Sequence, residues 1–128
     1  MIALLDTSTG LCQLSLASNG QLHNYQWQAD RQLAKGLLGF VERSLADLGA
    51  GFDDIVALGV YQGPGSYTGL RIGITVWNTM ADARGLPIVG GTGADWQDLV
   101  LQRLEAGEDD RLVLPEYGGQ ANITRPRK

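Results

Sequence analysis

The chain has 128 residues, 44% of them hydrophobic and 19% charged, which is the size and mix of one compact domain rather than two. Ten Lys and Arg residues against fourteen Asp and Glu residues give a formal net charge of -4. Three of the ten basic residues lie in the last four positions, so the rest (seven against fourteen) is near -7, a charge that argues against binding nucleic acid by the domain alone.

The opening residues predict neither a membrane span nor a signal peptide. No apolar run approaches the ~20 residues that cross a bilayer, and Asp6 interrupts the first apolar run before a signal-peptide core can form. We therefore expect a cytoplasmic protein with no membrane contact. The single cysteine, Cys12, cannot form an internal disulfide, and its apolar neighbours predict a small buried side chain.

The first 28 residues predict three strands joined as a meander. Residues 2–7 form a short apolar run, and residues 11–18 alternate in part between apolar and polar side chains. The pair Asn19-Gly20 favours the positive φ angles of a tight hairpin. Residues 21–28 then interleave apolar and polar side chains as a third strand.

The rest of the chain predicts three helices that alternate with two strands. The first helix begins at Asp30 as N-cap and ends before Gly49 and Gly51. The later elements follow from periodicity and from glycine and proline breaks: a strand at 55–62, a helix at 70–84, a strand at 88–90 and a helix at 94–105.

The order of elements, βββαβαβα, predicts an α/β domain of ribonuclease-H-like fold with a mixed five-stranded sheet. A strand–helix–strand unit crosses over right-handedly and adds a parallel strand to the antiparallel meander. We expect this domain to span residues 1–106. Residues 107–128 lack periodicity and are predicted to form a tail that ends in a basic tip, residues 125–128.

The second predicted helix has an apolar arc of roughly 200°, wider than one sheet face covers, and the first helix adds an apolar arc of its own. We therefore predict a partner-binding surface, with cover by the third helix and the tail as the alternative. Periodicity does not decide which face of the second helix meets the partner, but Ile74→Glu or Trp77→Glu is expected to disrupt pairing and leave the domain folded. The predicted contact residues are Leu33, Leu37, Phe40, Leu70, Ile74, Trp77, Met80 and Ala81.

The loop at residues 63–69 is rich in glycine and precedes a helix, so its backbone N–H groups are a candidate cradle for a phosphate. It lacks the Lys-Ser/Thr ending of a P-loop, and Ser66 or Thr68 is equally suited to cap the helix. Asp6 and Thr7, at the end of the first strand, complete a possible anion site. Turn formation by these two residues is the competing interpretation.

Side chains for catalysis are scarce. His23 is the only histidine and lies in a predicted strand, so neither a pair of metal-binding histidines nor a Ser–His relay can form within one chain. We therefore predict no catalytic residue, no metal site and no cofactor. A small anion- or nucleotide-binding module is the alternative function, and a peptidase is a third that no nucleophile–base pair supports.

The string GPGSYTGLRIG, residues 63–73, resembles the signature of the TsaB family. The resemblance extends to residues 4–9, 53–55 and 85–90, and so covers about residues 1–105. The signature residues carried by this match are Gly63, Pro64, Gly65, Ser66, Tyr67, Thr68, Gly69 and Arg71.

The resemblance implies an actin-like domain and a non-catalytic scaffold subunit that serves the threonylcarbamoyl modification of an adenosine in tRNA. It implies pairing through the first two helices with a TsaD-like catalytic subunit, a TsaE-like ATPase as a further partner, a homodimer as another form, and only indirect contact with tRNA. Two features depart from the family. The histidine that the family often carries near the start of the first helix is absent, and residues 114–128 resemble the family's closing segment joined directly to the first domain, as in a shortened form.

Overall fold

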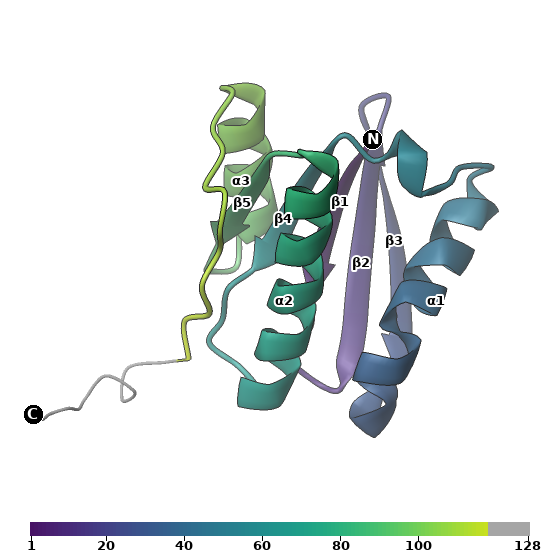
Figure 1. Ribbon diagram of the computed structural model, residues 1–128, viewed down its shortest axis with the longest axis vertical. Coiled ribbons are helices and arrows are strands. Elements are labelled where there is room, and N and C mark those ends of the chain that lie inside the picture. Colours follow the sequence, from purple (N-terminus) through teal and green to yellow (C-terminus); the bar gives the residue numbers. More distant parts are fainter. Residues whose placement is uncertain (118–128) are drawn as a thin grey trace, which may run out of the picture.

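The computed structural model describes residues 1–117 and has three layers, with α1 and α2 on one face of a five-stranded sheet and α3 on the other (Figure 1). The predicted α/β class and the order of elements are confirmed. The strands are β1 (Ile2–Asp6), β2 (Leu11–Ser18), β3 (Gln21–Gln28), β4 (Ala57–Tyr61) and β5 (Ile88–Gly91), and the α-helices are α1 (Leu33–Asp47), α2 (Tyr67–Arg84) and α3 (Trp96–Glu105). Two 3-10 turns, Asp30–Gln32 and Phe52–Asp54, precede α1 and β4.

The sheet is mixed, with strand order β3-β2-β1-β4-β5. β1, β2 and β3 pair antiparallel as the predicted meander, and Asn19 and Gly20 turn between β2 and β3 with φ of 52° and 76°. β4 and β5 join parallel to β1 through the helical crossovers. The carboxyl ends of β1 and β4 therefore lie at the same end of the sheet, where the chain turns into the loops that follow them.

The sheet separates two apolar clusters, because successive side chains of a strand point to opposite faces. Ala3 and Leu5 of β1 face α1 and α2, whereas Leu4 faces Trp96 and Val100 of α3. The largest fully buried side chain is Trp77 of α2, whose indole N–H donates to the carbonyl oxygen of Ala3 at 3.2 Å. α2 is thus fastened to the middle of the sheet.

The ends of α2 follow the sequence signals, but the start of α1 does not. The hydroxyl of Ser66 caps α2 by accepting from the N–H of Gly69 at 3.2 Å, and Gly85 ends the helix with φ of 66°. Asp30 is not the N-cap of α1, because it lies in the preceding 3-10 turn and its carboxylate accepts from the side-chain amide of Gln28. α1 begins at Leu33, after a residue whose side chain makes no capping hydrogen bond.

Residues 109–117, called the strap below, run from the edge of β5 along α2 to the start of that helix (Figure 1). Val113 of the strap is buried, and the side-chain amide of Asn78 bonds both its N–H and its carbonyl, each at 2.9 Å. Farther along, the N–H of Glu116 donates to the carbonyl of Gln62 at 2.7 Å. The sequence assigned these residues to a tail, and the basic tip of that tail, residues 125–128, lies outside the described residues.

Among residues 1–117, no helix is long and apolar enough to cross a membrane.

Candidate partner-binding surface

Seven of the eight predicted contact residues lie in the core of this chain. Met80 alone is partly exposed, and each of the others is at most 6% exposed. This part of the prediction is wrong, because a side chain covered by its own chain cannot contact a partner. The apolar arc of α2 is wide because the sheet, α1 and the strap all pack against it. The seven buried residues are Leu33, Leu37, Phe40, Leu70, Ile74, Trp77 and Ala81.

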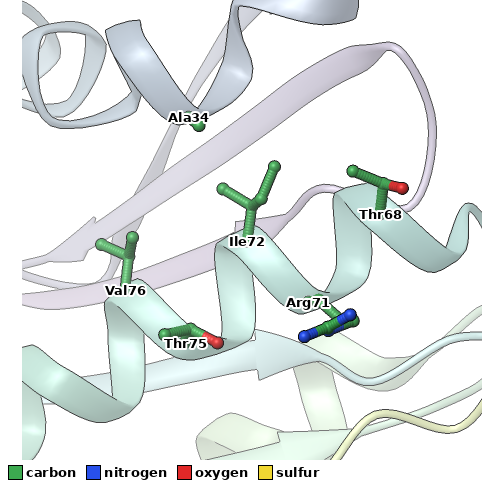
Figure 2. Close-up of a pocket in the computed structure, with 6 residues that line it drawn as sticks. All are labelled: Ala34, Thr68, Arg71, Ile72, Thr75 and Val76. Atoms are coloured by element: carbon green, nitrogen blue, oxygen red, sulfur yellow. The ribbon is translucent and has the colours of Figure 1, made fainter.

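The exposed side of the two helices carries a different set of apolar side chains. Thr68, Ile72 and Val76, spaced one turn apart on α2, point toward α1, where Ala34 lies opposite (Figure 2). Together with Arg71 and Thr75, these side chains line a hollow of about 340 Å³. The spacing of four residues puts this stripe on one side of α2.

A second hollow of about 440 Å³ continues toward the C-terminal end of α2. Its walls include Leu38 of α1, which is 52% exposed, and Met80 of α2. Thr75 and Val76 line both hollows, so the two adjoin, and we call them together the α1–α2 groove. The full set of residues that line it is Ala34, Leu38, Phe52, Thr68, Arg71, Ile72, Thr75, Val76, Thr79, Met80, Ala83 and Arg84.

The glycines of the signature loop allow α2 to approach the turn after β1. A Cβ on Gly69 would lie 2.3 Å from the carbonyl oxygen of Thr7, and a Cβ on Gly73 would lie 2.1 Å from its hydroxyl. The buried hydroxyl of Thr7 donates to the carbonyl of Gly69 at 2.7 Å. The N–H of Ser66 donates to the carbonyl of Ser8 at 2.7 Å. The signature therefore has a structural role in this chain, which is to dock α2 onto β1.

The side chains of the predicted anion site form hydrogen bonds within the chain. The carboxylate of Asp6 accepts from the N–H of Ser8 at 2.9 Å, which is the turn that the sequence offered as the competing interpretation. Thr7 is buried and bonded to Gly69, and Ser66 caps α2. The structure brings these residues together, but it uses them to hold the loop and the turn against each other.

The remaining signature residues lie around the start of α2. The guanidinium of Arg71 stands 5.3 Å from the ring centroid of Tyr67, and the ring centroid of Tyr117 lies 4.5 Å from that of Tyr67. Pro64 and Thr68 are exposed. Sequence reasoning missed the contribution of the strap, although the apolar run Leu112-Val113-Leu114 was a signal for it. Of the three, only Val113 is buried.

The titratable side chains of the interior are few. Burial, with a smaller effect of the Asp6 carboxylate, raises the pKa of the Cys12 thiol to about 12. His23 lies in β3, as predicted, and is half-buried. Within residues 1–117, no three His, Cys, Asp or Glu side chains are grouped as metal ligands.

Comparisons with known proteins match the fold and the loop to one family. Residues 27–91 match the family model described as "TsaD: tRNA N6-adenosine threonylcarbamoyltransferase". The tRNA threonylcarbamoyladenosine biosynthesis protein TsaB of Haemophilus influenzae is 34% identical over 66% of this chain and 36% of its own length. A tRNA N6-adenosine threonylcarbamoyltransferase of Geobacter is 40% identical over 76% of this chain and 28% of its own.

A solved structure agrees with these sequence matches. YeaZ from Pseudomonas aeruginosa superposes with a TM-score of 0.66 at 31% identity, over 71% of this chain and 43% of that one. The chain thus matches little more than a third of the TsaB relative and less than half of the YeaZ structure. Because the family model covers half of the chain and the structural match covers most of its fold, the chain belongs to the TsaB/TsaD family and is a TsaB-like member of it.

Proposed function

We propose that this chain is a non-catalytic scaffold subunit in the biosynthesis of threonylcarbamoyladenosine in tRNA, and that it docks a TsaD-like subunit through the α1–α2 groove. The names of its relatives supply the pathway. The subunit works in the cytoplasm and meets tRNA only through its partner. A TsaE-like ATPase joins the assembly that this pair forms.

The observation that carries the proposal is the exposed apolar surface of the α1–α2 groove. Leu38 is 52% exposed, and Ile72, Val76 and Met80 are each only partly covered by the chain. Removing apolar surface from water favours association, and flexible methionine side chains adapt to the shape of a partner. A partner helix laid along the groove would bury these side chains together.

A non-catalytic role is supported by the way in which the polar groups near the signature loop are used. Asp6, Thr7 and Ser66 each form hydrogen bonds that hold this chain's own turns. In this proposal the chain provides a surface, and its TsaD-like partner provides the chemistry.

The test compares two exposed leucines on opposite faces of the sheet. Leu38 lines the groove, whereas Leu99 of α3 is 44% exposed on the other face. Leu38→Glu would place a carboxylate in a contact that excludes water, and we expect the dissociation constant for the TsaD-like subunit of the same organism to rise at least about tenfold. Leu99→Glu is the matched control and should leave that constant unchanged. Isothermal titration calorimetry measures both.

Two results would contradict the proposal. One is equal affinity of the parent and Leu38→Glu for the TsaD-like subunit. The other is threonylcarbamoyl transfer to tRNA by this chain alone, measured with the TsaD-like subunit left out, because a scaffold has no such activity. Circular dichroism of each variant verifies that the domain is folded.

A further inference from the structure

The two faces of the sheet are covered unequally. α1 and α2 pack on one face, whereas α3 alone packs on the other, where it contacts β4 and β5 (Figure 1). The outer part of this second face, on β2 and β3, is largely bare among residues 1–117, and Gln13, Leu22, Asn24 and Gln26 are all exposed there. Because α3 stands on only part of the face, a step forms where the helix meets the bare strands.

A groove of about 590 Å³, called the α3 groove below, lies along this step between α3 and the hairpin that joins β2 to β3. Farther from the hairpin, hydrogen bonds join the helix to the strands. The side-chain amide of Gln97 donates to the hydroxyl of Ser15 at 3.0 Å, and that hydroxyl donates to the amide oxygen of Asn24 at 2.6 Å. These bonds hold α3 in place beside β2, so the groove is a built feature of the fold.

The floor of the α3 groove is apolar. Ile2 pairs with Ala17 and Ala17 pairs with Leu22 in the register of the sheet, so the three side chains lie next to one another across β1, β2 and β3. Leu101 adds an apolar side chain from α3. Leu22 is 41% exposed, and the other three are partly exposed. Covering this row of side chains would remove apolar surface from water and favour association.

The helical wall of the α3 groove is acidic. Asp98 and Glu105 are both exposed and lie two turns apart on one side of α3, about 10 Å from each other along the helix axis. The ion pairs formed within residues 1–117 belong to Arg103 and use other carboxylates. The N-terminal ammonium group, next to Ile2, donates to a backbone carbonyl. None of the eleven residues that line the groove is Lys, Arg or His, so its two negative charges are not neutralised from within it.

We propose that the α3 groove binds an amphipathic helix of a partner protein, which places two basic side chains, seven residues apart, against Asp98 and Glu105. Residues seven apart recur on the same side of a helix and therefore match the spacing of the two carboxylates. Apolar side chains between them would cover Leu22 and Leu101. A helix beside α3 would also complete the layer on this face of the sheet, as α1 and α2 do on the other.

Charge selects the class of partner. The chain has a formal net charge of -4, and such a surface attracts a basic segment and speeds its encounter with the groove. A purely apolar or acidic segment would instead take the carboxylates of Asp98 and Glu105 out of water without a partner, which is costly. The α3 groove and the α1–α2 groove lie on opposite faces of the sheet, so the proposal does not depend on the proposed function.

The test uses a synthetic peptide of about 18 residues, long enough to form a helix, with a stripe of leucines flanked by two lysines seven residues apart. A second peptide has glutamates in place of these lysines. Asp98→Lys/Glu105→Lys reverses the charge of the α3 groove. Glu42→Lys/Asp82→Lys is the matched control, because it changes the net charge equally at exposed positions of α1 and α2. Fluorescence anisotropy of the labelled peptides gives the dissociation constants for the full chain and its variants.

We expect the full chain to bind the lysine peptide with a dissociation constant below about 1 mM, and Asp98→Lys/Glu105→Lys to raise that constant at least about tenfold. Glu42→Lys/Asp82→Lys should leave it within about twofold, and the glutamate peptide should bind at least about tenfold more weakly. Absence of binding at that concentration would overturn the proposal. So would equal losses in the two double variants, because net charge rather than the groove would then explain the binding. Circular dichroism verifies that each variant is folded.

NMR chemical shifts of the isotope-labelled full chain locate the bound peptide. The amide signals of Ser18, Gly20 and Leu101 should move when the lysine peptide is added, because these residues line the α3 groove. Shifts confined to Ile72 and Val76 would overturn the proposal, since the peptide would then lie in the α1–α2 groove.

A last variant asks whether the basic tip of this chain competes for the same groove. Arg125→Gln/Arg127→Gln/Lys128→Gln removes the three positive charges of the tip. We expect its affinity for the lysine peptide to stay within about twofold of the parent value. Binding at least about tenfold tighter would assign the α3 groove to the chain's own tip and overturn the proposal of a partner helix.

Discussion

Ile74 and Thr75 are neighbours on α2 with opposite environments. Ile74 is 2% exposed in the core between α2 and the sheet, whereas Thr75 is exposed and lines the α1–α2 groove. Because an unpaired carboxylate cannot be buried at moderate cost, we expect Ile74→Glu to leave the chain largely unfolded at 25 °C, with a loss of several kcal/mol. Thermal unfolding followed by circular dichroism measures this loss.

Thr75→Glu is the control for this prediction, since it adds the same carboxylate one residue away in solvent. We expect its melting temperature to stay within a few degrees of the parent value. A folded, stable Ile74→Glu variant would show that the side chain lies on the surface, as the sequence first indicated. The face of α2 assigned to the core would then be wrong.

The stability of the fold depends on pH through the buried thiol of Cys12, because burial chiefly raises the pKa of that thiol to about 12. In the unfolded chain a thiol loses its proton near pH 8.5, whereas in the folded chain it keeps it up to about pH 12. Unfolding therefore releases a proton between these values, and the contribution to stability that is complete below pH 8.5 is lost as the pH rises toward 12. We expect urea unfolding to show a steeper fall in stability from pH 8.5 to 10.5 for the parent than for Cys12→Ala. Parallel pH profiles for the two proteins would contradict the assignment.

At the scale of elements, α2 is held from three sides. Trp77 packs against the sheet, α1 packs along one flank of the helix, and the strap packs along the other flank through Val113. The strap is also tied to β5 through Asp110. Burial acts to raise the pKa of that carboxyl, but the hydrogen bonds from Arg103 and from the N–H of Gly90 outweigh it, so the pKa is lowered. The strap therefore behaves as part of the sheet edge rather than as a free end.

The hydrogen-bonded contact between Asn78 and Val113 holds the middle of the strap against α2. Asn78→Ala removes two hydrogen bonds to partly buried backbone groups, and we expect a loss of about 1–3 kcal/mol in the free energy of unfolding. Urea unfolding measures the loss, and hydrogen exchange should show that the N–H of Val113 exchanges faster. Thr79→Ala is the control, because the hydroxyl of Thr79 bonds only to the carbonyl of Thr75 within the helix. Equal stability of the two variants would mean that the strap is not held by this contact.

At the scale of the whole molecule, local patterns predicted the elements and their order, because those signals lie within a few residues of one another. Ser66 and Gly85 mark the limits of α2 as their chemistry requires, and Asn19-Gly20 forms the hairpin turn. The orientation of α2 could not be predicted, since it depends on Val113 meeting Asn78 across 35 positions of sequence. Without that contact the apolar arc of the helix appeared to need an outside partner.

The site was predictable only in outline for the same reason. The two helices were identified, but apart from Met80 the side chains that face outward are not those named, because Leu37, Ile74 and Trp77 are buried in the chain's own core. Leu38 and Val76 adjoin named residues and point the other way. A shift of one or two positions along a helix changes the face by 100° or more, so a phase error exchanges core and surface.

The strap has a consequence for how the protein is made. Residues 109–117 are translated after every helix and strand of the domain, yet they supply the groups that close the β5 edge and one flank of α2. Since a nascent chain leaves the ribosome from its N-terminus, α2 and β5 emerge with exposed polar and apolar groups before their cover exists. In that interval the β5 edge is open, and the N–H groups of Ile88 and Gly90 lack the carboxylates of Asp109 and Asp110.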